Sequence, residues 1–311
     1  MNSALCELSI VIPLFNEEEN IPELVSDFIK LKTMLPSSTE IIFVDDGSMD
    51  ATAKLIKKIK LPFTILLISL SRNFGHQSAL LAGLEKAAGK FVVTMDGDLQ
   101  HPPELIPKML EQHRKGIDIV LTQRLDGQIT SRFKKMSAHC FYQLMNTFSE
   151  VQIGWNTSDF RSLNRVALDN LLALPEKRKF LRGMTQWLGF SVITLPFQVQ
   201  PRRKGKSKYS VIKMLKLALY GISSFSTMPL YLSGLFSLVL FASALLYAVY
   251  VLYVRFIVND VVSGWASLLF VLLIIGGFLS FFLGVIGMYL AAIYDEVKQR
   301  PNYIIQDEKK L

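Results

Sequence analysis

Apolar and polar residues alternate in regular blocks along the first 125 positions of the chain. Short apolar runs, rich in β-branched residues, predict buried strands at Leu8–Phe15, Glu40–Val44, Phe63–Leu70, Phe91–Met95 and Asp118–Thr122. Apolar residues at helical spacing between these runs predict helices at Ile21–Leu35, from about Ala51, at Gln77–Ala88 and at Pro103–Lys115. Because strands and helices alternate, we expect an α/β fold with a mostly parallel, doubly wound sheet.

After Arg124 the pattern becomes irregular. Helices are predicted at Ser131–Ser149 and Arg165–Leu174, and a strand at Val192–Leu195. The segment Tyr209–Tyr220 places lysines among apolar residues, which is typical of an amphipathic helix in the membrane interface. A surface helix of a soluble protein is the alternative.

Two long apolar runs near the C-terminus predict membrane-spanning helices. They cover about Tyr231–Val254 and Trp265–Tyr294, and each exceeds the ~20 residues that cross a bilayer. We therefore expect a soluble domain in residues 1–205, a juxtamembrane segment in 206–228, a transmembrane hairpin in 229–296 and a tail in 297–311. The small residues Gly276, Ser280 and Gly284 share a face of the second helix, which allows a homo-oligomer, either a dimer or a tetramer.

The net charge of +8 is concentrated beside the apolar runs. Basic residues precede the first run and follow the second, whereas the connector carries only Arg255 against Asp260. The positive-inside rule then places both flanks and both termini in the cytoplasm. No nucleic-acid recognition motif accompanies the basic residues, so we expect them to meet anionic lipid or a phosphate-bearing substrate. Cys6 and Cys140 lie far apart, and no Cys/His spacing resembles a zinc site.

The candidate chemistry begins at Asp96-Gly97-Asp98, directly after a predicted buried strand. Two carboxylates that converge on one point favour a hard divalent cation, Mg²⁺ or Mn²⁺, which usually also binds the phosphate oxygens of a substrate. A solvated Asp-Gly turn is the alternative. The strand before the motif and the helix start at Pro102-Pro103 after it favour a functional site.

Polar residues also follow the other predicted strands, where parallel sheets bind their ligands. These clusters are Asn16-Glu17, Asp45-Asp46, Arg72-Asn73 and Arg124. The first strand lacks a Gly-x-Gly-x-x-Gly loop, and no Gly-Lys-Ser/Thr loop is present. A dinucleotide-dependent redox enzyme and a P-loop NTPase are therefore disfavoured.

Taken together, these motifs resemble the membrane-bound polyprenyl-phosphate hexosyltransferases of inverting glycosyltransferase family 2, which have the GT-A fold. This group includes bactoprenol glucosyltransferases and dolichol-phosphate mannose synthases. The resemblance rests on Ser9–Glu17, Val44–Ser48, Ser71–Gly75, Asp96–Pro103, Ser158–Arg161, Phe180–Gly183 and Gly205–Tyr209, followed by two spans. The order and spacing of these motifs along the chain are together specific to this group.

The resemblance implies a role for each of several residues. Pro13, Glu17 and Asp45 would hold the nucleotide, and Asp46 and Arg72 are grouped with them as donor-binding residues. Asp96, Asp98 and Gln100 would hold the metal. The residues expected to bind the acceptor phosphate are Arg124, Arg132, Lys134, Ser137, Arg202 and Arg203. The match is loose in this region, so the equivalent basic residue among Arg132, Lys134 and Lys135 stays open. Ser158 stands where glycine is usual.

The chemistry of such a transfer can be argued independently. A phosphate monoester is mostly doubly ionised near pH 7, because its second pKa is about 6, so it needs no strong general base. The catalyst must instead hold two anions together with cations. We assign Asp159 a positioning role, with capping of the next helix as the alternative. His101 could contact phosphate or pack in the core, and His76 and His113 read as surface or core residues.

The resemblance thus implies an integral protein of the bacterial inner (plasma) membrane that moves a hexose, glucose from UDP-glucose, onto undecaprenyl or another polyprenyl phosphate at the cytosolic face. The product would serve later lipopolysaccharide or cell-envelope glycan modification. Alternative donors are GDP-mannose, UDP-N-acetylhexosamine and UDP-aminoarabinose. A polysaccharide synthase is disfavoured because its Gln-x-x-Arg-Trp motif is absent. A membrane assembly subunit without catalysis is disfavoured by the intact Asp96-Gly97-Asp98.

Overall fold

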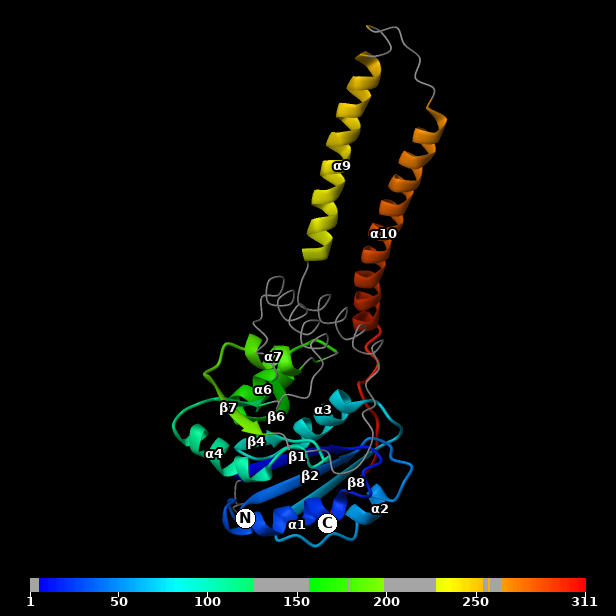
Figure 1. Cartoon of the computed structure of the whole chain (residues 1–311). Coiled ribbons are helices and arrows are strands. Elements are labelled where there is room, and N and C mark those ends of the chain that lie inside the picture. Colours follow the sequence, from blue (N-terminus) through cyan, green and yellow to red (C-terminus); the bar gives the residue numbers. More distant parts are fainter. Residues whose placement is uncertain are drawn as a thin grey trace. The chain divides into compact units, whose positions relative to one another are not determined.

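The computed structural model describes residues 6–125, 157–177, 179, 181–198, 228–253, 257 and 264–311 (Figure 1). These residues belong to two compact units. The first holds the described residues up to 198 together with Arg300–Leu311, and the second holds those between 228 and 299. The predicted helices at 131–149 and 209–220 lie outside the described residues.

The first unit is built on a mixed sheet with the strand order β7-β5-β6-β4-β1-β2-β3-β8. The neighbours β4, β1, β2 and β3 are parallel, and β5 is parallel to β7. Strands β6 and β8 run antiparallel to their neighbours. The strands are β1 (Leu8–Leu14), β2 (Thr39–Asp45), β3 (Thr64–Leu70), β4 (Phe91–Thr94), β5 (Ile119–Leu125), β6 (Thr157–Asn164), β7 (Val192–Gln198) and β8 (Ile305–Lys310).

Helices cover both faces of this sheet, as a doubly wound arrangement requires. Figure 1 shows α1 and α2 on one side of the central strands and α3 on the other. The chain steps from β1 to β2 to β3 in one direction and then crosses back to β4, which moves α3 to the opposite face. The helices are α1 (Ile21–Lys30), α2 (Thr52–Ile56), α3 (His76–Lys86), α4 (Ile106–Arg114), α6 (Arg165–Ala173) and α7 (Leu181–Trp187), with 3₁₀ turns at Leu31–Thr33 and Pro103–Leu105.

The core explains why the central strands were readable from the sequence. Every residue of β1 and β4 is buried, because helices pack on both faces, and such strands read as continuous apolar runs. Helix α1 turns Ile21, Leu24 and Phe28 toward the sheet and keeps charged residues outside. The predicted strand at Val192–Leu195 is confirmed as part of β7.

Two strands were missed by the sequence reasoning. Strand β6 reads Thr-Ser-Asp-Phe-Arg-Ser-Leu-Asn, in which polar residues dominate because several of its side chains enter a polar network. Strand β8 reads Ile-Gln-Asp-Glu-Lys-Lys and was expected to be part of a tail. It is an exposed edge strand, held by backbone pairing to β3 and by ion pairs of Asp307 with Lys57 (3.3 Å) and Glu308 with Lys86 (2.7 Å).

The second unit contains two long apolar helices, α9 (Met228–Tyr253) and α10 (Trp265–Val297). Both have windows long and apolar enough to cross a membrane, at Ser233–Tyr250 and Ile274–Val297. The helices meet through the ring of Phe236, whose centroid lies 4.8 Å from that of Phe278 and 6.0 Å from that of Phe282. They can form the expected hairpin.

Candidate functional site

The polar clusters predicted from the sequence gather at one edge of the sheet. Strands β1, β2 and β4 are parallel, so the residues that follow Leu14, Val44 and Thr94 emerge at the same edge. Pro13 lies near the end of β1, opposite Val44 of β2. The polar clusters that follow these three strands therefore share one sheet edge, as the sequence predicts.

The loops after β1 and β2 are locked together by side-chain to backbone hydrogen bonds. The amide of Asn16 donates to Ser48 Oγ at 2.9 Å, and Asn16 has a left-handed φ of 54°. The amide of Glu17 donates to Thr52 Oγ1 at 2.9 Å, and Asp45 Oδ1 accepts from the amide of Ser48 at 3.1 Å. The predicted donor residues Glu17 and Asp45 are therefore held in one rigid unit.

Asp46 holds the loop that carries Arg72. Its two carboxylate oxygens accept the backbone amides of Phe74 (2.7 Å) and Gly75 (2.9 Å). Burial raises the pKa of Asp46, and these two hydrogen bonds oppose the rise. The neighbouring Gly47 has φ of +69°, and a Cβ there would lie 2.5 Å from the carbonyl carbon of Arg72. Asp46 therefore supports the loop that carries Arg72.

The Asp-Gly-Asp turn places its two carboxylates differently. Asp96 Oδ1 lies 3.3 Å from His76 Nε2, and it is a buried oxygen that accepts no hydrogen bond from the described part of the chain. Asp98 Oδ1 accepts from the amide of Gln100 at 3.2 Å. Burial raises the pKa of Asp96, partly offset by His76. Within the described ranges, no group of three or more His, Cys, Asp or Glu residues could hold a metal ion by itself.

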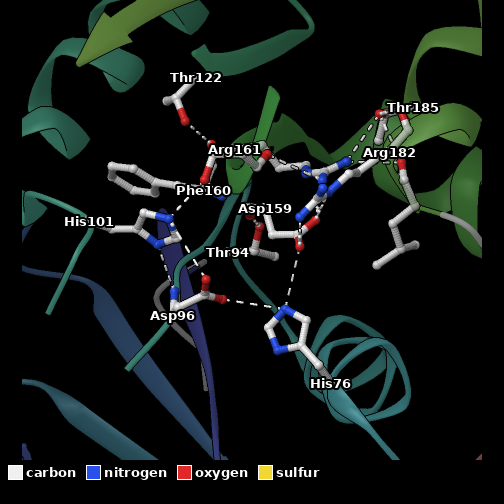
Figure 2. A network of polar contacts seen from close by, with 12 residues as sticks. His76, Thr94, Asp96, His101, Thr122, Asp159, Phe160, Arg161, Arg182 and Thr185 are labelled. Carbon is white, nitrogen blue, oxygen red and sulfur yellow. Dashed lines mark hydrogen bonds and ion pairs between the residues drawn. The ribbon is translucent and has the colours of Figure 1, made fainter. Parts of the chain in front are cut away.

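Asp159 is the most heavily bonded carboxylate of the site (Figure 2). Its Oδ1 accepts from Arg161 Nη2 at 2.6 Å and from Arg182 Nε at 3.0 Å, and its Oδ2 accepts from Arg182 Nη2 at 2.6 Å. His76 Nε2 lies 3.5 Å from the same Oδ2. Burial alone would raise the pKa of Asp159, but Arg182, His76 and Arg161 outweigh it and hold the pKa well below its usual value. This carboxylate stays ionised.

The end of β6 is fixed by hydroxyl groups of its neighbours. The regular β4–β6 pairing ends at Thr94 opposite Arg161. Beyond it, Thr94 Oγ1 donates to the carbonyl of Asp159 at 2.6 Å, and Thr122 Oγ1 donates to the carbonyl of Phe160 at 2.6 Å. The capping alternative for Asp159 is wrong, because α6 is capped by Asn164, whose side chain accepts from the amide of Ala167. Asp159 is a strand residue turned into the network.

His76, the first residue of α3, was not recognised from the sequence as part of the site. Its Nε2 faces both Asp96 and Asp159, and its side chain is 41% exposed. Burial lowers the pKa of His76, but the bond to Asp159 and the charges of both carboxylates outweigh this and raise it. The sequence does carry one signal for this role: His76 comes directly after Gly75, where β3 leads into α3.

His101 joins the site from the opposite side of Asp96. Its Nδ1 accepts from the amide of Asp96 at 3.0 Å, and its Nε2 lies 2.8 Å from Ser158 Oγ and 3.3 Å from Arg124 Nη2. Burial and the charge of Arg124 lower the pKa of His101 to about 3, so the ring is neutral. The alternative that His101 packs in the core is confirmed, because its ring stacks on that of Phe160 with centroids 5.2 Å apart.

Arg124, at the end of β5, is the predicted acceptor-side residue that the structure brings to this network. The other predicted acceptor-side residues lie outside the described residues. They are Arg132, Lys134, Ser137, Arg202 and Arg203.

Comparison with known proteins identifies the family to which this chain belongs. The model of glycosyl transferase family 2 matches residues 9–172. The chain belongs to glycosyl transferase family 2. It is 37% identical to the bactoprenol glucosyl transferase of Shigella phage SfV, with 98% of this chain and 99% of that protein covered. It is also 37% identical to a prophage bactoprenol glucosyl transferase homolog of Escherichia coli (strain K12), covering 98% and 100%.

A solved structure agrees on the fold of the first unit. Glucosyl-3-phosphoglycerate synthase from Mycobacterium tuberculosis, solved with phosphoglyceric acid, matches with a TM-score of 0.50 at 18% sequence identity. The match covers 70% of this chain and 78% of that one. The sheet is therefore of the GT-A type, as the family resemblance implied. As a member of glycosyl transferase family 2, the protein is a transferase.

Proposed function

We propose that this glycosyltransferase moves a hexose, glucose from UDP-glucose, onto undecaprenyl or another polyprenyl phosphate at the cytosolic face of the bacterial inner membrane. The relatives named as bactoprenol glucosyl transferases support the lipid acceptor and the sugar, because the similarity extends over nearly the whole of both chains. The product would be a polyprenyl-phosphate sugar for later modification of a cell-envelope glycan.

The bonding of Asp159 is the observation that carries this proposal. A hydroxyl acceptor needs a general base to take its proton, and a carboxylate beside the reacting sugar is a common choice. Asp159 is already bonded on both oxygens by Arg161 and Arg182, and its depressed pKa makes it a weak base. An acceptor that arrives already ionised needs no base, and a lipid phosphate is such an acceptor.

The residues of the Asp-Gly-Asp turn fit a divalent cation, Mg²⁺ or Mn²⁺, bound with the donor. Asp96 offers a buried carboxylate oxygen without a hydrogen bond in the described part of the chain, and Asp98 and Gln100 add oxygen ligands nearby in sequence. This is a small protein ligand set, which suits an ion that takes further ligands from a diphosphate and water. When bound, the ion would offset the negative charge of the leaving nucleotide.

The remaining residues position the two substrates. Glu17 and Asp45, in the interlocked loops, are suited to the nucleoside, with Pro13 beside them and with Arg72 on the loop that Asp46 holds. Arg124 supplies a guanidinium that can bind phosphate oxygens in pairs. The ionised Asp159 would orient a sugar hydroxyl or stabilise positive charge at the anomeric carbon during inversion.

The pairing of β8 with β3 supports a membrane topology in which both chain ends share a compartment. Strand β3 precedes α9 in the chain, and β8 follows α10. Backbone hydrogen bonds join Leu311 to Ile65 and Ser71 to Ile304, each at 2.9 Å. Two segments can pair in this way only on one side of a bilayer, so the helices between them would enter and return. The basic residues of the flanks favour the cytoplasmic side.

A transfer assay tests the proposed function. Purified full-length protein is incubated with undecaprenyl phosphate and radiolabelled UDP-glucose, GDP-mannose, UDP-N-acetylhexosamine or UDP-aminoarabinose, each with and without Mg²⁺ or Mn²⁺. We expect a metal-dependent lipid-phosphate glucoside from UDP-glucose, identified by mass spectrometry. Efficient transfer to a hydroxyl acceptor in place of lipid phosphate would overturn the acceptor, and preference for another nucleotide sugar would overturn the donor.

A further inference from the structure

Two serines of β6 each contact the ring of a buried histidine. Ser158 Oγ lies 2.8 Å from His101 Nε2, and Ser162 Oγ lies 2.6 Å from His113 Nε2. All four residues are buried. The two serines are four positions apart on an extended strand, where alternate side chains share a face. The described residues therefore include two comparable Ser–His pairs, and one of them reaches the site.

The backbone fixes a different tautomer in each ring. His101 Nδ1 receives the amide N–H of Asp96, which can only donate, so Nε2 carries the ring proton and donates it to Ser158 Oγ. With this tautomer, Arg124 Nη2, 3.3 Å from Nε2, lies beside the ring without a hydrogen bond to it. His113 Nδ1 lies 2.7 Å from the carbonyl oxygen of Ile117, which can only accept, so Nδ1 carries the proton. The hydroxyl of Ser162 then donates to His113 Nε2.

The Ser158–His101 pair joins the two carboxylates of the site through its hydrogen bonds. On one side, His101 holds the backbone of Asp96. On the other, Ser158 is bonded to the amide of Phe160 at 3.3 Å and directly precedes Asp159 in β6. The ring itself has little freedom, because its side chain is 0% exposed and it packs against Phe160 and Phe197. Moving the ring would move both carboxylates.

We propose that Ser158 and His101 are a positioning pair that sets the spacing between Asp96 and Asp159, and through it the affinity for a divalent cation with a nucleoside diphosphate. This inference rests on the proposed function, because it assumes that Asp96 binds the cation. Ser162 and His113 form the matched pair that supports only the fold.

Binding of Mn²⁺ in the presence of UDP, followed by electron paramagnetic resonance on the full-length protein, tests the pair without relying on turnover. Ser158→Ala should raise the apparent Kd for Mn²⁺ on the order of tenfold, as is typical when a residue that orients a metal ligand is lost. Ser162→Ala removes a comparable hydroxyl–imidazole contact from the same strand, and it should leave that Kd unchanged. In transfer assays, Ser158→Ala should raise the KM for UDP-glucose and not that for lipid phosphate.

A double-mutant cycle separates the pair from each residue alone. In His101→Asn the amide oxygen can take the place of Nδ1, so the bond from Asp96 is kept while the contact with Ser158 is lost. This variant should match Ser158→Ala, and the double variant should bind Mn²⁺ no more weakly than either single one. Ser158→Thr keeps the hydroxyl and should bind Mn²⁺ within about twofold of the wild type, a range within which additive effects usually fall.

The outcomes distinguish this inference from the function it rests on. If the wild-type protein binds no Mn²⁺ with UDP, both the cation assignment and the positioning pair fail. If the wild-type protein binds Mn²⁺ but Ser158→Ala and Ser162→Ala bind alike, only the pair is overturned. Should Ser158→Ala not fold, His101→Asn decides: an unchanged Kd overturns the pair, and a rise supports it.

Discussion

The paired hydrogen bonds between Arg182 and Asp159 give the sharpest test of the positioning role of Asp159. Arg182 donates two hydrogen bonds, from Nε at 3.0 Å and from Nη2 at 2.6 Å, to different oxygens of Asp159. Arg161 also binds this carboxylate, so Arg182→Ala leaves the buried charge compensated but removes the pair of hydrogen bonds that fixes both oxygens. Arg182→Lys restores a positive charge at a single point, which cannot span both carboxylate oxygens.

The size of the effect follows from this bonding. A hydrogen bond to a charged group contributes about 1.5–3 kcal/mol, but the Arg182 side chain is 35% exposed and solvent screens part of that. We expect Arg182→Ala to lower the free energy of unfolding by about 1–2 kcal/mol. If the same energy orients Asp159 in the transition state, kcat falls about tenfold, since about 1.4 kcal/mol corresponds to a factor of ten. Arg182→Lys should bring the free energy of unfolding closer to the wild-type value than it brings kcat.

Denaturant unfolding and steady-state transfer, measured on the same preparations, check this prediction. Arg165→Ala is the control, because Arg165 donates to the carbonyl oxygens of Ala87 and Gly89 and to no residue of the site. It should lose stability and keep kcat once corrected for the folded fraction. Equal kcat losses in Arg165→Ala and Arg182→Ala, or full activity in Arg182→Ala, would refute the orienting role of Asp159.

Four further outcomes are expected. Asp98→Asn should lose metal-dependent transfer and the Mn²⁺ binding detected by paramagnetic resonance, while its free energy of unfolding stays within about 0.5 kcal/mol of wild type. Wild-type turnover by this variant would refute the metal assignment. Arg124→Ala should raise the KM for lipid phosphate more than that for UDP-glucose, and the reverse split in the kinetics would remove Arg124 from the acceptor side. Burial lowers the pKa of His113, so its contribution to stability is present above its unfolded pKa of about 6.5 and is lost as pH falls through the folded pKa. His113→Gln should therefore reduce the slope of unfolding free energy against pH on the acid side by up to about 1.4 kcal/mol per pH unit. Parallel curves for the variant and the wild type would contradict this. In oriented vesicles, the connector around Asn259 and Asp260 should be cut by protease only from the extracytoplasmic side, and cleavage from the cytosolic side would overturn the topology.

The elements that could be read from the sequence are those buried on both faces or made of continuous apolar residues. Strands such as β1 and β4 and the helices α9 and α10 belong to this class, and in each the residue pattern matches the environment. Strands β6 and β8 could not be read, because β6 turns charged side chains into an internal network and β8 is an exposed edge. Their strand form depends on partners far away in the sequence, which no local pattern reports.

The candidate site divides in the same way. Asp96, Arg124 and Asp159 stood out because charged residues follow apolar runs or lie in a recognisable motif. Their connections did not, because they depend on the register that places Thr94 opposite Arg161. That register brings Asp159 toward the Asp96 turn, and it gives His76 two carboxylates to contact. A histidine at the start of a helix carries no such information by itself.

The charge balance of this network bears on the kind of reaction it can serve. Among the described residues, the three guanidinium groups of Arg124, Arg161 and Arg182 are matched by three carboxylates. These are Asp96, Asp98 and Asp159. His76, whose pKa is raised, adds a further positive charge when it is protonated. An excess of fixed positive charge in a partly buried setting is costly unless anions occupy it. Transfer from a nucleoside diphosphate to a phosphate brings two anions together, and a surplus of preorganised cations offsets their repulsion without rearrangement during the reaction. A neutral hydroxyl acceptor would leave the positive charge on the acceptor side uncompensated, and it would still lack a general base. The arrangement that suits a lipid phosphate is therefore poorly matched to a free sugar.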